Sequence, residues 1–359
     1  MNMKIATIVG ARPQFIKAAT LSRCIEGQAD ITEVLIHTGQ HYNANMSDVF
    51  FTELNIRQPD HHLGIGGGTH GENTGRMIEG IEKVLIKEQP DWVLVYGDTD
   101  STLAGTLAAV KLHIPLAHVE AGLRSFNRHM PEEINRVLTD HAADLLFVPT
   151  TTAVANLAAE GITGDKVKLV GDVMYDATLY YQAKARKPSA VAINDSKPFV
   201  LCTIHRAENT DDAVRLTAIV QTLNQLAEQM PVILPLHPRT VAAMKRLQGV
   251  TLNPAVQVIE PVGFLEMTWL LAHCHLVVTD SGGVQKEAYF HQKPCITLRD
   301  ETEWVELVEA GFNCLLSPFA TDTLEVFSQM KAVAIPRGDG QYGNGDAAGK
   351  IVQLIASYK

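Results

Sequence analysis

The sequence has few of the residues that build disulfide, metal or redox frameworks. Five cysteines are spread over 359 residues, and none forms a Cys-x-x-Cys pair, so neither a zinc ribbon nor a redox dithiol is indicated. An odd number of cysteines without a signal peptide is typical of a reducing compartment. A His-Glu-x-x-His motif or other spaced ligand set is also missing. We therefore expect no catalytic metal and a cytoplasmic location.

Long apolar runs and an excess of positive charge are lacking as well. No run approaches the roughly 20 apolar residues that cross a bilayer, and the first run, Lys4–Val9, is too short for a secretory signal. The formal net charge is −10 at pH 7, whereas nucleic-acid and membrane-surface proteins usually carry a basic face. We expect neither a nucleic acid nor a membrane as a partner.

What remains suits a globular α/β protein of about two domains. Apolar residues make up 46% of the chain and charged residues 19%, so sizeable cores are expected and wholesale disorder is not. At typical domain sizes, a chain of 359 residues corresponds to about two domains.

Strand-like and helix-like segments alternate along the chain. Near-continuous apolar runs, typical of parallel strands covered on both faces, predict strands at 4–9, 33–37, 92–96, 115–119, 145–148, 168–170, 199–204, 232–236, 256–260, 276–279, 295–298 and 313–316. Apolar spacing of three and four predicts helices in the first half at about 14–26, 44–54, 73–88, 101–112, 132–143 and 152–160.

The order of these segments predicts two doubly wound, Rossmann-like domains that face each other across a cleft. We place the N-terminal domain at 1–171 and the C-terminal domain at 172–345, with the crossover near Gly171 and Asp172. The last helix, within 346–359, is a candidate to pack on the first domain. A ligand would bind between the two domains.

Three acidic residues follow predicted strands or open a predicted helix. Asp98 comes after the run 92–96, Glu120 after 114–119, and Glu132 near the start of the helix that Pro131 opens. Because ligands of open α/β sheets bind outside the carboxyl ends of the strands, these acids would lie at one rim. There they could move protons on and off a substrate. The alternative is that they cap helices or form ion pairs.

The first strand–helix loop, Gly10–Lys17, carries neither a Gly-x-Gly-x-x-Gly nor a phosphate-loop fingerprint, and we expect no nucleotide cofactor. It places Arg12 beside Pro13, a residue suited to the start of a helix. Anions are favoured at a helix start, and the planar guanidinium binds phosphate in a bidentate manner. Arg12 is therefore a candidate phosphate ligand, unless it is a solvated residue in a plain turn.

The segment Thr279–Glu287 has the pattern of a diphosphate site. Ser281 is a natural N-cap, and Gly282 and Gly283 let the backbone approach a ligand closely. Exposed amides at the helix start would hold phosphate oxygens. Glu287 lies about one and a half turns further on, where a carboxylate can accept hydrogen bonds from ribose hydroxyls.

Two histidines, His205 and His237, also end predicted strands. His205 could donate to a phosphate or to a sugar hydroxyl. The alternative for both is a hydrogen-bonded core histidine, which fits His237 better.

Nine segments along the chain, in order, carry a family resemblance: GARPQFIKA, HTGQHY, VYGDTDST, HVEAGLRS, PEEINR, IHRAEN, LPLHPR, TDSGGVQKEA and RDETEW. Together they resemble the non-hydrolysing UDP-N-acetylglucosamine 2-epimerases. The resemblance implies a GT-B-like fold, a homodimer, and a reaction that expels UDP from C1, forms a glycal and re-adds UDP with C2 inverted.

The resemblance also implies residue roles. Asp98, Glu120 and Glu132 match the catalytic acids, and His205 matches the active-site histidine. Arg12, Ser281 and Gly283 match phosphate ligands, and Glu287 the ribose ligand. We expect uracil to meet the backbone near Phe264, and the substrate-binding set also to include Lys17, Arg136 and Gly282.

Some positions depart from the commonest family pattern. Gln14 replaces a glutamate and Trp304 an arginine, and the loop 125–130 is short and basic. These features resemble the branch that acts on UDP-2,3-diacetamido-2,3-dideoxyglucuronic acid, in which Arg128 or His129 would meet the C6 carboxylate or the 3-acetamido group. A solvated Arg128 is the alternative. Gln40 and His41 resemble part of an effector site, and regulation stays open.

Three other functions share parts of this pattern. A UDP-sugar glycosyltransferase would use the same nucleotide pocket, a hydrolysing epimerase would let water trap the intermediate, and a regulatory protein would bind the nucleotide sugar without turnover. Deuterium incorporation at C2 without an acceptor excludes the glycosyltransferase. Steady release of free UDP and reducing sugar would favour the hydrolysing epimerase, and binding without turnover would favour the regulatory protein.

Overall fold

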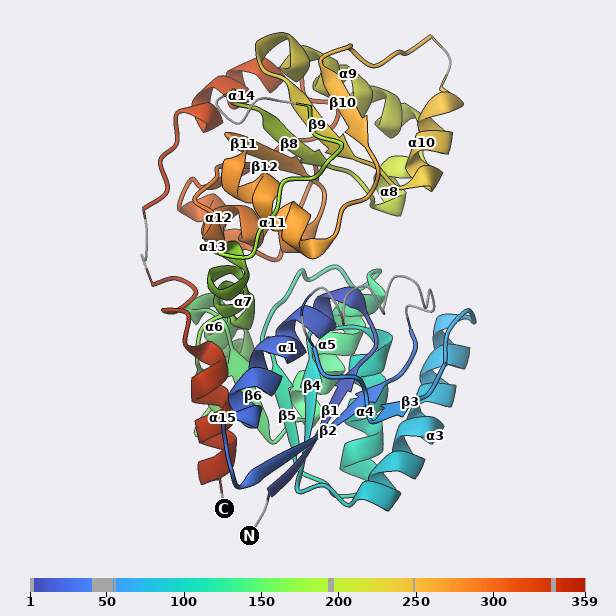
Figure 1. Cartoon of the computed structure of the whole chain (residues 1–359), viewed down its shortest axis with the longest axis vertical. Helices are drawn as coiled ribbons and strands as arrows, with labels where there is room; N and C mark the ends of the chain where they lie inside the picture. The colour runs from blue at the N-terminus through green and yellow to red at the C-terminus, as the bar shows by residue number, and fades with distance from the viewer. Residues whose placement is uncertain are drawn as a thin grey trace. The chain divides into compact units, whose positions relative to one another are not determined.

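The structure is a computed structural model that describes residues 3–40, 54, 56–192, 197–247, 249–336 and 340–358, and of Arg12 only the backbone. The helix expected at 44–54 lies outside the described residues except for its last position. The chain forms two compact units. Unit 1 comprises 1–179 and 340–359, and unit 2 comprises 180–339 (Figure 1). The change of unit falls at 179–180, whereas the sequence places the crossover near Gly171.

Unit 1 is built on a parallel sheet of seven strands in the order β3-β2-β1-β4-β5-β6-β7. The strands are β1 Met3–Val9, β2 Ile31–His37, β3 His61–His62, β4 Trp92–Tyr96, β5 Leu116–Val119, β6 Leu145–Val148 and β7 Val167–Leu169. Its helices are α1 Arg12–Glu26, α3 His70–Glu88, α4 Asp100–Lys111, α5 Pro131–Ala142, α6 Thr151–Ala159, α7 Val173–Gln182 and α15 Ala347–Ser357. The chain therefore winds away from the centre in both directions, and β1 and β4 meet where the winding reverses.

Unit 2 repeats the design with a parallel sheet of six strands in the order β10-β9-β8-β11-β12-β13. The strands are β8 Val200–Thr203, β9 Val232–Pro235, β10 Val256–Ile259, β11 Leu276–Thr279, β12 Cys295–Thr297 and β13 Asn313–Leu315. The helices are α8 Ala207–Thr210, α9 Ala213–Gln229, α10 Pro238–Lys245, α11 Phe264–His273, α12 Gly282–Phe290, α13 Val305–Glu309 and α14 Thr323–Lys331. Here the winding reverses between β8 and β11.

The apolar runs of the sequence form these sheets because both faces of each sheet are covered. In β8, Val200 and Cys202 belong to one core cluster and Leu201 to another, so alternate side chains enter separate cores. All five residues of β4 are buried. Each buried aliphatic side chain contributes about 1.5–3 kcal/mol relative to exposure, so the burial of these runs stabilises both sheets.

The C-terminal helix α15 completes unit 1 rather than unit 2. It packs against α1, and its buried side chains Ala347, Ala348, Ile351, Val352 and Ile355 recur at helical spacing. The carboxylate of Asp176, on α7, accepts a hydrogen bond from the backbone N–H of Ala348 at 2.8 Å and so caps the start of α15. Unit 2 begins within α7, at Tyr180, and ends before α15, so it is an insertion within unit 1.

Most of the expected strands differ from their predicted bounds by one or two residues, and one described strand is additional. The two-residue strand β3 pairs with β2 at the edge of the sheet and was not expected, because two histidines carry no apolar period. Among the described helices, none is long and apolar enough to cross a membrane.

Candidate active site

The predicted site residues of unit 1 gather at the point where the winding of its sheet reverses. Asp98 follows β4, Glu120 follows β5, and Arg12 opens α1 directly after β1. The carboxyl ends of adjacent parallel strands share one edge of the sheet, which is where open α/β sheets bind ligands. The side chain of Arg12 lies outside the described residues, so its contribution stays a prediction.

Glu120 occupies a strained elbow at the end of β5. Its φ is 71°, in the left-handed region that glycine favours. Its backbone N–H and that of Ala121 both donate to the carbonyl of Phe147, each at 3.1 Å. The Glu120 carboxylate forms an ion pair with Lys17, which α1 supplies, and both side chains are 9% exposed. Strain of this kind costs of the order of 1–3 kcal/mol and is typical of functional sites.

Asp98 is held by groups from α5. Its carboxylate forms an ion pair with Arg136, and the Asp98 side chain is 30% exposed while that of Arg136 is 6% exposed. Asn135 donates from Nδ2 to the Asp98 carbonyl at 3.0 Å and to the Asp100 carboxylate at 3.2 Å. The structure thus brings Asp98, Lys17 and Arg136 to the same edge as Glu120, with each of the two carboxylates beside a cation.

Two neighbouring glutamates at the start of α5 have different environments. Glu132 is exposed, so its carboxylate is open to a ligand. Glu133 is 3% exposed and accepts hydrogen bonds from the N–H and the hydroxyl of Ser125, at 2.9 and 3.0 Å, and from the N–H of Phe126 at 2.9 Å. Glu133, which the sequence does not single out, therefore anchors the loop 125–130.

That loop presents three side chains to solvent. Arg128 and His129 are exposed, and Phe126 is 75% exposed with a φ of 59°. The hydrogen bonds to Glu133 fix the loop backbone, so the three exposed side chains project from an ordered loop.

Gln14 has a role that the sequence does not reveal. Its Oε1 accepts hydrogen bonds from the N–H groups of Gly10 and Ala11 at 2.8 and 3.0 Å. Its Nε2 donates to the carbonyl of Tyr96 at 2.9 Å and to the hydroxyl of Thr102 at 3.0 Å. The side chain is 1% exposed. Gln14 therefore ties the loop after β1 to the loop after β4, across the point of reversal.

In unit 2, His205 and Ser281 lie at the corresponding point, after β8 and β11. The Nδ1 of His205 lies 3.0 Å from the Asp280 carboxylate, and the His205 side chain is 60% exposed. The Asp280 side chain is fully buried and also accepts from the N–H groups of His205 and Arg206 and from Nδ2 of Asn209, each at 3.1 Å. Burial alone would raise the pKa of Asp280, but the hydrogen bond and charge of His205 and the Asn209 bond lower it below its usual range.

The start of α12 is capped by Ser281, and its role as an anion site stays a prediction. Ser281 accepts a hydrogen bond from the N–H of Val284 at 3.4 Å. Gly283 is exposed and Glu287 half-buried on the same helix. A Cβ on Gly282 would lie 2.0 Å from Oε1 of Glu303, so a larger residue at that position would require the Glu303 side chain to move.

The segment 299–304 packs onto this helix start. Arg299 is 2% exposed and pairs with Glu303 at 3.0 Å. Trp304 donates from Nε1 to the carbonyl of Gly282 at 2.8 Å, and the Lys286 ammonium lies 4.4 Å from the centre of its ring. Trp304 thus holds the turn at Gly282 by a hydrogen bond, and the face of its ring forms a cation–π contact with Lys286.

The side chains of two further predicted residues, Phe264 and His237, make contacts within unit 2 that hold local structure. Phe264 begins α11, is 5% exposed and packs edge-on against Tyr181 at 5.4 Å, so only its backbone is left for a base. His237 is exposed, so it is not the core histidine that the sequence favours; its ring caps α10 and accepts from the N–H of Arg239 at 3.3 Å.

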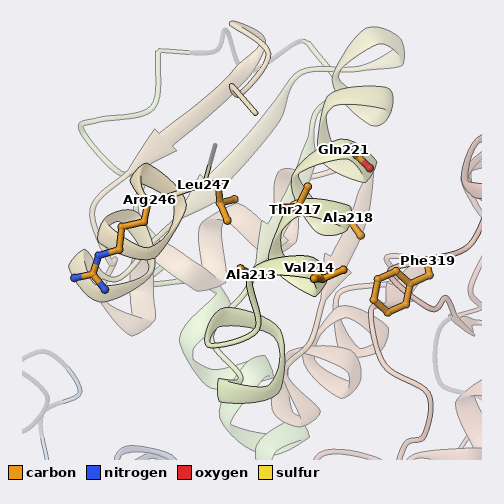
Figure 2. A pocket seen from close by; sticks show the side chains of 8 residues that line it. All are labelled: Ala213, Val214, Thr217, Ala218, Gln221, Arg246, Leu247 and Phe319. Atoms are coloured by element: carbon orange, nitrogen blue, oxygen red, sulfur yellow. The ribbon is translucent and has the colours of Figure 1, made fainter. Parts of the chain in front are cut away.

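One surface pocket lies away from every predicted residue. Figure 2 shows it on unit 2, lined by Ala213, Val214, Thr217, Ala218, Gln221, Arg246, Leu247 and Phe319. Within the described part of the chain, no three His, Cys, Asp or Glu side chains are grouped as metal ligands.

Fold and site together define a class. Two Rossmann-like units, one with carboxylates and the other with a glycine-rich helix start at the reversal point, are those of a GT-B-like enzyme of nucleotide sugars. The model of the family described as UDP-N-acetylglucosamine 2-epimerase matches residues 23–356. The chain belongs to this family, and the predicted fold class and enzyme class, a UDP-sugar 2-epimerase, are confirmed.

Individual relatives align with this chain over nearly its whole length. The chain is 55% identical to the UDP-2,3-diacetamido-2,3-dideoxy-D-glucuronate 2-epimerase of Pseudomonas aeruginosa over 358 residues, which cover 99% of each chain. A crystal structure of the Methanocaldococcus jannaschii UDP-GlcNAc 2-epimerase in complex with UDP-GlcNAc and UDP has a TM-score of 0.89 and 44% identity, covering 99% of this chain and 100% of that one. The Neisseria meningitidis UDP-GlcNAc 2-epimerase bound to UDP-GlcNAc has a TM-score of 0.89 at 32% identity, with the same coverage.

Proposed function

We propose that the chain is a non-hydrolysing 2-epimerase of a UDP-2-acetamido sugar, with UDP-2,3-diacetamido-2,3-dideoxyglucuronic acid as its substrate. The observation that carries the reaction type is the arrangement of Asp98 and Glu120 at adjacent strand ends, each carboxylate beside a cation. The 55% identity to the Pseudomonas enzyme supports the substrate.

The chemistry follows from the C2–H bond, which has no neighbouring carbonyl to make it acidic. When UDP leaves C1 with the electron pair of the C–O bond, charge builds at C1 and the C2 proton becomes removable. A carboxylate takes the proton, and the C–H electron pair forms the C1–C2 double bond of a glycal. A proton then returns to C2 on the opposite face while UDP re-adds to C1, which inverts C2. Asp98, Glu120 and Glu132 supply the proton transfers.

The departing diphosphate needs stabilisation more than any other group, because it leaves as an anion. We assign this task to the start of α12, with Ser281, Gly282 and Gly283, and to His205, whose exposed ring is oriented by Asp280. Glu287 is the ribose ligand and the backbone at Phe264 meets the uracil. Arg12, Lys17 and Arg136 complete the positive charge around the substrate.

Solvent deuterium tests the reaction type. In D2O with the UDP-sugar alone, both epimers are expected to carry deuterium at C2, with a detectable glycal and no net release of reducing sugar. Asp98→Asn should abolish the exchange, whereas Glu79→Gln, which removes only an exposed ion pair with Lys83, should not. A requirement for an acceptor or for added NAD, or exchange that survives in Asp98→Asn, contradicts the proposal.

The substrate proposal rests on Arg128. Its guanidinium, on the loop that Glu133 fixes, is proposed to meet the C6 carboxylate, a charge-assisted contact worth about 1.5–3 kcal/mol. Arg128→Ala should therefore lower kcat/KM for the uronate about 10- to 100-fold and leave UDP-GlcNAc turnover unchanged. Glu79→Gln is the control, and His129→Ala tests the neighbouring candidate in the same way. An unchanged ratio of the two kcat/KM values rules out this contact.

We further propose a homodimer that acts in the cytoplasm. All five cysteines are free thiols, three of them buried, which supports a reducing compartment. Light scattering after gel filtration should give twice the chain mass of 39.2 kDa. A single-chain mass at micromolar concentration would contradict the dimer.

A further inference from the structure

We propose that the buried pair His118–Asp140 is a brace that positions the Asp98 and Glu120 carboxylates relative to each other. The inference rests on the proposed function, in which these two carboxylates act on the sugar. His118 and Asp140 would touch no substrate atom, since both side chains are 0% exposed. They would act through the backbone on which the two acids sit.

His118 reaches the turn that carries Asp98. It lies on β5, beside β4, and its Nε2 donates to the carbonyl of Gly97 at 2.7 Å. Its Nδ1 donates to the Asp140 carboxylate at 2.7 Å. Both nitrogens donate because a carbonyl can only accept and an ionised carboxylate has no hydrogen. The ring is therefore fixed at two points, one of them directly before Asp98.

Asp140 reaches the turn that carries Glu120. It lies on α5, and its Oδ2 accepts from the N–H of Gly122 at 3.0 Å and from Nη1 of Arg124 at 2.7 Å. Burial alone would raise the pKa of this carboxyl, but the bonds and charges of His118 and Arg124 hold it below its usual range. A continuous chain of hydrogen bonds thus runs from Gly97 through His118 and Asp140 to Gly122.

The two turns that the brace connects contain residues with positive φ. Gly97, Glu120 and Gly122 all have positive φ, at 62°, 71° and 80°. A Cβ on Gly97 would lie 3.2 Å from Oε2 of Glu120 and 3.3 Å from Nζ of Lys17, so the Glu120 carboxylate lies directly over the Gly97 backbone. A shift of either turn would change the separation of the two acids.

Stability alone is a poor explanation for this pair. Replacing a buried ion pair by apolar residues of similar volume is often neutral or stabilising, because two charges must be removed from water. Here Nε2 of His118 and Oδ2 of Asp140 each form a hydrogen bond with a backbone group of one of the two turns. A second ion pair joins Nε of Arg124 to Oε1 of Glu160 at 2.6 Å, so the brace also contacts the residue that follows α6.

His118→Phe keeps the ring and removes both donated hydrogen bonds. We expect kcat to fall about 100-fold, the loss that a displacement of about 1 Å can cause. The Kd for UDP should stay within about 2-fold, because most of the assigned nucleotide ligands, Ser281, Gly283 and Glu287 among them, lie on unit 2. The primary isotope effect on kcat with substrate deuterated at C2 should rise, since proton abstraction becomes slower. Thr106→Val, which removes a buried hydroxyl between α4 and α5, is the matched control for stability and should leave the isotope effect unchanged.

Asp140→Asn is the conservative variant that keeps the geometry. The amide can donate to Nδ1 of a neutral His118, whose Nε2 still donates to Gly97, and its oxygen can accept from Gly122 and Arg124. It should retain kcat within about 3-fold of wild type, a change of less than 1 kcal/mol, with a wild-type isotope effect. If folded Asp140→Asn loses as much kcat as Asp140→Ala, the charge rather than the geometry matters and the brace is refuted.

Two results separate this inference from the proposed function. If Asp98→Asn and Glu120→Gln retain turnover, the assigned acids are wrong whatever His118→Phe does. If those variants are inactive while His118→Phe is folded and has wild-type kcat and isotope effect, only the brace is wrong. Loss of kcat in His118→Phe without a change in isotope effect, and in proportion to the loss of folded protein, also overturns it.

Discussion

Asp176 makes the stability of unit 1 depend on pH in a direction that can be worked out. The residue is 9% exposed, and its Oδ2 caps α15 through the N–H of Ala348. Its Oδ1 is buried without a hydrogen-bond partner among the described residues. Burial raises the pKa of this carboxyl from 3.8 to about 6, in spite of the backbone hydrogen bonds from Ala348 and Ala347, and the charges of Asp172 and Asp346 raise it further.

The sign follows from the two pKa values. The folded state binds the proton more tightly than the unfolded state, whose pKa is near 3.8. The stabilisation is therefore complete below about pH 4 and is lost as the pH rises through about 6. A shift of about two units corresponds to roughly 3 kcal/mol. Because the group is partly solvated, and Asn loses a favourable charge at a helix start, we expect a net effect of about 1–2 kcal/mol.

Asp176→Asn tests this reasoning, because the amide oxygen can still accept from Ala348. At pH 7.5 the variant should be more stable than wild type by about 1–2 kcal/mol in urea unfolding, with Tm higher by about 2 °C. At pH 4 the difference should vanish. Asp30→Asn, at an exposed position, is the control and should show no such trend. The reasoning is refuted if the variant is less stable at pH 7.5, or if the difference is the same at both pH values.

Two further substitutions probe the supports of the site. Gln14→Leu keeps the volume of the side chain but removes its four buried hydrogen bonds. The free energy of unfolding should therefore fall by about 2–4 kcal/mol in urea titrations, and kcat should fall with it. Full activity at unchanged stability would show that the two loops do not need this connection. Asp280→Ala leaves the N–H groups of His205 and Arg206 without their acceptor and frees the His205 ring, so kcat should drop about 100-fold in steady-state assays. An Asp280→Ala enzyme with wild-type kcat would show that His205 needs no orientation.

The strands could be predicted because each is a short apolar run buried on both faces. The runs at 92–96, 145–148 and 276–279 coincide with β4, β6 and β11 from end to end. The same logic placed Asp98, Glu120, His205 and Ser281, because a polar residue directly after such a run falls at the carboxyl edge of the sheet.

The supports of the site could not be predicted in this way. Gln14 bonds to Tyr96 and Thr102, more than 80 residues away, and no local pattern encodes such contacts. Glu132 and Glu133 are adjacent and identical in type, and only the helical phase separates them: Glu133 shares the buried face of α5 with Arg136 and Asp140. Polar residues spaced three and four apart, at Glu133, Arg136 and Asp140, were the sequence signal that could have identified this buried face.

The return of α15 to unit 1 has a consequence for biosynthesis. The apolar side of α1 leaves the ribosome near the beginning, yet its partner helix α15 begins only about 320 residues later, roughly 160 of which form the inserted unit. At about 5–20 residues per second that is a delay of some 16–64 seconds. During this interval the nascent chain displays an uncovered hydrophobic surface, which makes unit 1 a natural client for a chaperone until translation has passed residue 357.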